Sequence, residues 1–140
     1  MSLAHYFTHI AHLIGHPSRA LMLDALLGAE RAVSAYDVLQ LLREKEVHWQ
    51  PPTVYRALSF LVEAGMVHYI QSIQKYMVCH HQHCGHVTQL LICHQCGLVQ
   101  EVPIAESLVT ELEQQAATHH FHLIPQFLEL QGICASCLDA

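Results

Sequence analysis

The chain has 140 residues, of which 52% are hydrophobic and 13% charged, and its formal net charge is −6. This length suits one ordinary domain or two small ones, and the composition excludes an intrinsically disordered protein. No apolar run is long enough to span a membrane, and no basic leader followed by an apolar stretch opens the chain, so we expect a cytoplasmic protein without a membrane partner.

Charged residues are unevenly distributed along the chain. Residues 1–78 contain six basic and six acidic side chains, whereas residues 79–140 contain six acidic side chains and neither Lys nor Arg. The second half would therefore repel a polyanion that the first half would tolerate. The 14 histidines exceed ordinary usage, and in a reducing compartment the six cysteines favour metal ligation over disulfides.

The first 65 residues carry mainly helical signals. Residues 3–28 have helical spacing with a break at Gly15–Pro17, which predicts two short helices. Ser34–Asp37 has the pattern of a capping box at the start of another helix. Pro51–Thr53 predicts the start of a further helix, because the first turn does not need the N–H that proline lacks, and Gly65 is well placed to end it.

Two short stretches of strand composition follow these helices. Val67–Ile70 and Tyr76–Cys79 are joined through Ser72–Lys75, which predicts a β-hairpin. Helices followed directly by a hairpin indicate a winged helix, in which a two-stranded wing flanks the recognition helix. Pattern alone leaves any other small α+β domain as the alternative.

The remainder of the chain reads as a second small domain after a linker. Residues 80–87 are polar, rich in histidine and without periodicity. Beyond them Gln89–Ile92, Leu98–Val102 and Phe127–Leu130 have strand character, and Ile104–Ala117 has helical character. We therefore expect an α+β protein.

Two CxxC pairs lie far apart in the second half, at Cys93/Cys96 and at Cys134/Cys137. Each pair sets two sulfur atoms at the separation of adjacent corners of a tetrahedron, and Gly97 relaxes the backbone of the first turn. Four sulfurs with no open position are typical of a structural zinc site. Redox-active dithiols or buried free cysteines are the alternatives.

A second metal site near the linker is indicated by clustered donors. His68, Cys79, the histidine-rich residues 79–86 and the acidic residues beyond them are the candidates. A single histidine is more often a surface or core residue than a ligand, so the residues by themselves do not select the ligand set.

Several stretches of the chain resemble a known family. Ser34–Leu39, Gln50–Leu58 and Gly65–His68 resemble the DNA-binding domain of zinc uptake regulators, a branch of the ferric uptake regulator family. The similarity continues in order and spacing through the later motifs, which are Phe60-Leu61, Cys79, His86, Cys93-x-x-Cys96-Gly97, Glu101 and Gly132-Ile133-Cys134-x-x-Cys137. It covers nearly the whole chain and weakens before residue 17.

The resemblance implies a homodimer that binds double-stranded operator DNA and about two Zn²⁺ ions per chain. It implies a winged-helix DNA-binding domain at 1–79, a hinge at 80–87 and a small α/β dimerisation domain at 88–140. The structural zinc would be held by the four cysteines already named. The regulatory zinc would be bound by four residues from wing, linker and second domain, namely His68, Cys79, His86 and Glu101.

The expected recognition helix also carries polar side chains. Opposite its apolar face helical periodicity places Arg56, Ser59, Phe60 and Glu63, with Thr53 and Tyr55 on the flanks. The resemblance assigns Tyr55 and Arg56 to base edges and matches Arg19 to a family arginine, whereas residue types alone also allow a half-buried Tyr55 and a solvated Arg56. We expect DNA contacts from Tyr55, Arg56, Thr53 and Arg19.

Other functions remain open at this level. The scarcity of Lys and Arg favours a zinc-buffering protein that has lost operator binding. A metalloenzyme would need an open metal position and a base, and no HExxH motif is present, so we expect no enzyme and no small-molecule substrate besides the metal ion. A family sensor of another metal or of peroxide is a nearer alternative. The sequence leaves undecided whether a third site forms from His81, His83, Cys84, His119, His120 and His122.

Overall fold

The computed structural model describes residues 17–29, 31–45, 48–79, 87–124 and 127–139. The chain divides into two compact units, Met1–Gln82 and His83–Ala140. The first of the two helices expected within residues 3–28, and residues 80–86 of the histidine-rich linker, lie outside the described residues.

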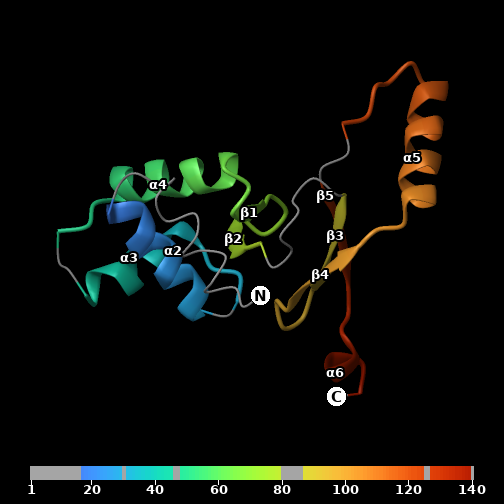
Figure 1. The fold of residues 1–140 in the computed structure, drawn as a ribbon. Helices are drawn as coiled ribbons and strands as arrows, with labels where there is room; N and C mark the ends of the chain where they lie inside the picture. The colour runs from blue at the N-terminus through green and yellow to red at the C-terminus, as the bar shows by residue number, and fades with distance from the viewer. Residues whose placement is uncertain (1–16, 30, 46–47, 80–86, 125–126, 140) are drawn as a thin grey trace, which may run out of the picture. The chain divides into compact units, whose positions relative to one another are not determined.

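The described part of the first unit has a body of three helices: α2 (Pro17–Ala29), α3 (Ala35–Arg43) and α4 (Pro51–Glu63) (Figure 1). The expected capping box begins α3, because the Ser34 side chain accepts the Asp37 N–H while the Asp37 carboxylate accepts the Ser34 N–H. Two unpaired donors of the first turn are thereby satisfied.

Helix α4 begins and ends where the sequence predicts. Pro51 and Pro52 occupy its first turn. Gly65 has a φ of 76° just past its end, and the N–H groups of Gly65 and Met66 donate to the carbonyls of Val62 and Leu61. This pair of bonds is a Schellman motif, for which glycine is favoured because the conformation is left-handed.

The core of the first unit lies between these helices. Val54, Ala57, Leu58 and Leu61 of α4 are buried at the spacing of one helix face. They pack with buried residues of the other two helices, including Met22, Leu26, Val38 and Leu42.

A hairpin completes this unit. Strands β1 (Val67–Ile70) and β2 (Lys75–Val78) are antiparallel, with Val67 opposite Val78. Tyr76 also exchanges two backbone hydrogen bonds with Val33 in the segment before α3, at 2.9 and 2.7 Å. The helices α2–α4 followed by this hairpin make the expected winged helix.

The second unit is built on a mixed three-stranded sheet of order β4-β3-β5 (Figure 1). The central strand β3 (Thr88–Cys93) is antiparallel to β4 (Val99–Pro103) and parallel to β5 (Phe127–Gly132). Helix α5 (Glu106–Thr118) connects the two outer strands, and a four-residue helix α6 (Ala135–Leu138) follows β5. The parallel pairing and α6 are absent from the sequence-based expectation.

Candidate metal centres

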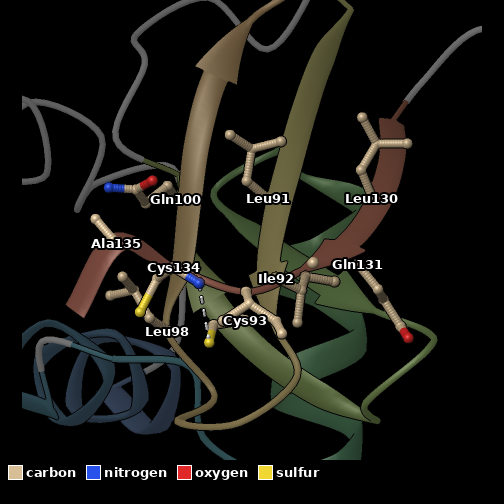
Figure 2. A pocket seen from close by; sticks show the side chains of 11 residues that line it. Leu91, Ile92, Cys93, Leu98, Gln100, Leu130, Gln131, Cys134 and Ala135 are labelled. Carbon is tan, nitrogen blue, oxygen red and sulfur yellow. Dashed lines mark hydrogen bonds between the residues drawn. The ribbon is translucent and has the colours of Figure 1, made fainter. Parts of the chain in front are cut away.

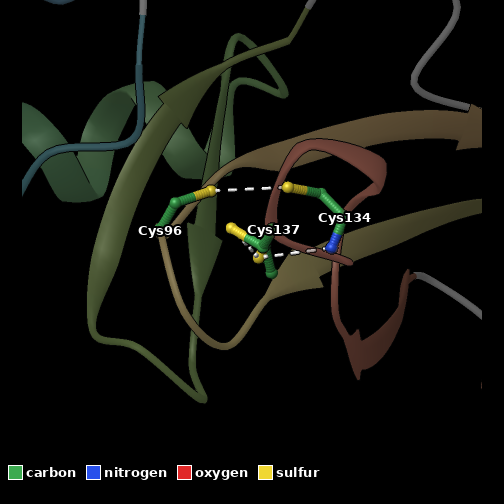
Figure 3. Close-up of side chains that lie close together, drawn as sticks. Cys96, Cys134 and Cys137 are labelled. Atoms are coloured by element: carbon green, nitrogen blue, oxygen red, sulfur yellow. Dashed lines mark hydrogen bonds between the residues drawn. The ribbon is translucent and has the colours of Figure 1, made fainter. Parts of the chain in front are cut away.

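Four cysteines of the second unit converge on one point (Figure 3). The Sγ atoms of Cys93 and Cys137 are 3.8 Å apart, those of Cys96 and Cys134 are 3.7 Å apart, and all four lie within 4.8 Å of one another. The cysteines that the structure describes are free thiols, and these separations far exceed a disulfide bond of about 2.05 Å. Among the cysteines that it describes, the structure therefore records no disulfide.

The parallel pairing of β3 with β5 brings the two CxxC loops together. It sets Cys93, the last residue of β3, opposite Gly132, the last residue of β5, and the His94 N–H donates to the Gly132 carbonyl at 2.8 Å. The first loop closes through a 3.0 Å bond from the Gly97 N–H to the Cys93 carbonyl, with Gly97 at a φ of 77°. Cys134 is the N-cap of α6.

Electrostatics in this cluster favour a cation. N–H donation from the backbone of Cys96, and then of Cys134, lowers the pKa of Cys93 to about 6. The hydrogen bond between the Cys137 and Cys134 side chains raises the pKa of Cys137 to about 12, because it favours the protonated form of Cys137. A tetrahedral ion with zinc–sulfur bonds of about 2.3 Å separates its sulfurs by about 3.8 Å. The donor set and its spacing fit a four-cysteine zinc site.

A second pair of donors lies at the base of the wing in the first unit. His68 on β1 and Cys79 just after β2 are 2% and 6% exposed, and their nitrogen and sulfur lie within 4.8 Å of each other. The pairing of the strands causes this proximity, since the Cys79 N–H donates to the Met66 carbonyl at 2.9 Å. An imidazole and a thiol side by side can provide two ligands to zinc.

The other two expected regulatory ligands belong to different parts of the chain. Glu101 is half-buried on β4 of the second unit, opposite Leu90 of β3. His86 lies outside the described residues. Of the residues considered for a third site, His119, His120 and His122 are exposed, while His81, His83 and Cys84 lie outside the described residues. No third cluster of metal donors occurs within the described segments.

Helix α4 exposes the side chains expected to contact DNA. Thr53, Tyr55 and Arg56 are all exposed, and Tyr55 retains 55% of its accessible surface. The alternative of a half-buried core tyrosine is therefore wrong. Phe60 differs from its expected position on the polar face, because it is half-buried against the core where α2 packs on α4. The guanidinium of Arg19 lies 3.6 Å from the centroid of the Phe60 ring.

Sequence reasoning missed an apolar hollow on the sheet of the second unit (Figure 2). Leu91, Leu98, Leu130 and Ile133 line it, and each is more than a third exposed. The signal was present in β3, where Leu90, Leu91 and Ile92 are consecutive apolar residues. Such a run indicates a strand that is covered on both faces.

The comparisons with known proteins agree with this architecture. The family model of the ferric uptake regulator family matches residues 15–131. The chain belongs to the ferric uptake regulator family. It is 40% identical over 124 residues to the zinc uptake regulation protein of Escherichia coli (strain K12), covering 88% of this chain and 72% of that protein. It is 31% identical over 126 residues to the ferric uptake regulation protein of Bacillus subtilis (strain 168), covering 86% and 83%.

Two solved structures extend the likeness within this family. One is a zinc uptake regulator complexed with zinc and DNA, with a TM-score of 0.85 at 35% identity over 99% of this chain and 97% of that one. The other is holo XcZur, with a TM-score of 0.77 at 37% identity over 89% and 86%. The resemblance to the zinc uptake regulator branch is confirmed. Within the described segments, no helix is long and apolar enough to cross a membrane.

Proposed function

We propose that this family member is a zinc-responsive, DNA-binding transcriptional repressor of zinc uptake and homeostasis genes. One observation carries the proposal: a buried histidine and cysteine lie side by side in the same winged-helix unit that exposes Tyr55 and Arg56. Metal donors at the base of the wing connect zinc binding to the domain that would read DNA. The zinc regulators among its relatives support the choice of metal and of genes.

We assign the four-cysteine cluster to a structural zinc. The sulfur spacing supports this role, because all four tetrahedral corners are filled and no position is open for a substrate. The cluster joins the end of β3 to the end of β5, so metal binding contributes to the folding of the second unit.

We assign the regulatory zinc to His68, Cys79, His86 and Glu101. The thiol in this set favours zinc over ferrous iron or manganese, whose sites contain mainly histidine and carboxylate ligands. When bound, zinc supplies bonds that join the wing, the linker at 80–87 and the domain at 88–140. The ligands thereby favour one arrangement of the DNA-binding domain at 1–79, and an affinity difference between arrangements is what a sensor requires.

The proposed DNA surface consists of Tyr55, Arg56 and Thr53 on α4, together with Arg19. Arg56 is suited to the O6 and N7 atoms of guanine, and the Tyr55 ring to a thymine methyl group. Their exposure supports this role, since side chains that read base edges must project from the recognition helix into the major groove.

The partner that we propose for the second unit is another copy of this chain. None of the described side chains of α5 is buried, and the hollow lined by Leu91 and Leu130 is an exposed apolar surface. Exposed apolar patches of this kind mark interaction sites in soluble proteins. We further infer that the protein has no enzymatic activity, because both clusters suit binding and neither is accompanied by a catalytic motif. The proposed DNA binding also leads us to infer a cytoplasmic protein.

The test is DNA binding as a function of zinc. Fluorescence anisotropy of a duplex selected by the protein from a random-sequence pool should show tight binding with zinc and weak binding after chelation of the regulatory metal. A zinc-buffering protein would instead bind two zinc ions and select no duplex. A sensor of another metal would bind the duplex more tightly with iron or manganese than with zinc.

A further inference from the structure

Arg19 and Phe60 form a stacked pair between two helices of the winged-helix unit. Arg19 lies in the first turn of α2, and its guanidinium carbon is 3.6 Å from the centroid of the Phe60 ring on α4. The rest of the half-buried ring packs against the core cluster. The ring is therefore fixed by packing, and it offers the flat guanidinium a fixed surface.

Phe60, the α4 member of the pair, lies one turn after an exposed basic residue of the same helix. Phe60 is four residues after Arg56, so the two side chains are neighbours on the helix surface. Glu63, three residues after Phe60, is the acidic residue of the same surface. The chain has only six Lys and Arg residues; one of them, Arg19, stacks on Phe60, and another, Arg56, lies one helical turn before it.

A stacked guanidinium suits the recognition of a phosphate. Stacking covers one face of the planar group, whereas its N–H donors lie in the plane and point away from the ring. A long side chain that is ordered before binding loses less conformational entropy when it contacts its ligand. An unstacked arginine would lose that entropy on binding.

We propose that Phe60 is a positioning residue for DNA recognition, which holds the Arg19 guanidinium ready to contact a backbone phosphate beside the bases read by Arg56. This inference rests on the proposed function, because it requires DNA binding. It adds a role for Phe60 that its half-buried position does not by itself require.

A double-mutant cycle tests the inference. The affinity of the zinc-loaded protein for its selected duplex is measured at several salt concentrations for the wild type, Phe60→Leu, Arg19→Gln and the double variant. Phe60→Leu should weaken binding about two- to tenfold, the range expected for the lost ordering of one long side chain. Arg19→Gln should make the slope of log affinity against log salt shallower by about 0.9 per chain, since each chain loses one phosphate contact.

The cycle separates positioning from a structural role. If Phe60 acts through Arg19, Phe60→Leu has no further effect in the Arg19→Gln background, and Phe60→Tyr binds like the wild type. Val62→Ala, at a partly buried position of α4 packed on the same core, is the matched control and should have equal effects in both backgrounds.

Two results would overturn the positioning role of Phe60, and a third, distinguishable from them, would reject the proposed function. Equal weakening by Phe60→Leu with and without Arg19, in proteins of measured folding stability, would assign Phe60 to the core alone. An unchanged salt slope in Arg19→Gln would remove the phosphate contact. Failure of the zinc-loaded wild type to bind any duplex would reject the proposed function, and this inference with it.

Discussion

The backbone N–H of Cys134 donates a 3.3 Å hydrogen bond to the Sγ atom of Cys93, 41 positions earlier in the chain. The bond joins the N-cap of α6 to the end of β3. A backbone N–H directed at sulfur favours the thiolate, which is the form that binds metal. Backbone geometry in the second unit therefore favours the metal-binding form of Cys93.

Removal of one sulfur from this cluster should destabilise the second unit. We expect Cys96→Ser to lose one zinc equivalent per chain and to unfold or dissociate this unit, because metal binding contributes to its folding. Zinc content, circular dichroism and size-exclusion chromatography measure these effects. Gln95→Ala, in the same loop, is the matched control. A Cys96→Ser protein with native helicity, an intact dimer and full zinc content would show that the site is not structural.

The wing cysteine should control the response to zinc without controlling the fold. We expect Cys79→Ser to retain its helicity and structural zinc but to lose zinc-dependent DNA binding. A shift of a two-state hinge from 1:99 to 99:1 requires about 5.5 kcal/mol of differential binding, and one ligand of four contributes a large part of that.

The control for Cys79→Ser is His48→Gln, which changes an exposed histidine of the same unit. It should bind zinc and DNA like the wild type. Normal repression by Cys79→Ser at low zinc concentration would mean that the regulatory ligands lie elsewhere.

The capping box of α3 gives a prediction about stability. Ser34→Ala removes the oxygen that accepts the Asp37 N–H at 3.1 Å, and should lower the free energy of unfolding by about 1 kcal/mol. Urea denaturation of the zinc-loaded protein measures the change. Ser107→Ala, an exposed serine within α5, should have a much smaller effect. Equal losses from both substitutions would mean that the cap contributes nothing specific.

The Asp37 carboxylate, which accepts the Ser34 N–H in this capping box, makes the contribution of the box to stability depend on pH. Hydrogen bonds from the Ser34 backbone N–H and then its side chain lower the pKa of Asp37. The contribution of Asp37 is therefore present above its unfolded pKa of about 3.9 and is lost as the pH falls through the folded value. The stability difference between wild type and Asp37→Asn should shrink as the pH falls from about 6 to about 3. A constant difference would contradict this account.

Local signals in the sequence predicted the local structure well. Ser34 and Gly65 mark helix ends through bonds within a few residues, and those bonds are present. The parallel alignment of Phe127 with Thr88 could not be predicted, because nothing near either residue records a pairing across 39 positions. Phe60 was misplaced for a similar reason, since a single helix cannot reveal that α2 covers it.

The candidate site divides in the same way. The two CxxC spacings predicted the four-cysteine cluster. Each pair is formed by residues close in sequence, and the chain has only one other CxxC pair with which it can complete a four-sulfur site. The proximity of His68 to Cys79 depends on strand register, which the alternation of residues in the hairpin does not fix. Only the pairing of Val67 with Val78 sets it.

The chain has few Lys and Arg side chains with which to bind DNA. Residues 1–78, which include the proposed DNA surface, contain six basic and six acidic side chains, and each Lys or Arg contact to a phosphate steepens the salt dependence of binding. We therefore expect a shallow slope of log affinity against log salt, about −2 to −4 per pair of domains compared with about −10 for lac repressor. Specificity should then depend on Tyr55 and Arg56, together with backbone N–H groups at helix starts.

Arg56→Ala should weaken operator binding by about 1 to 3 kcal/mol per contacted base and reduce discrimination against random DNA. Histidines offer a competing source of charge, because partial protonation would strengthen binding as the pH falls from about 8 to about 6. Titrations of the zinc-loaded protein across salt and pH distinguish the two. A shallow slope without pH dependence supports recognition through α4, whereas a slope that steepens at low pH identifies protonated histidines at phosphates. A steep slope at every pH would mean that the DNA-binding surface lies elsewhere.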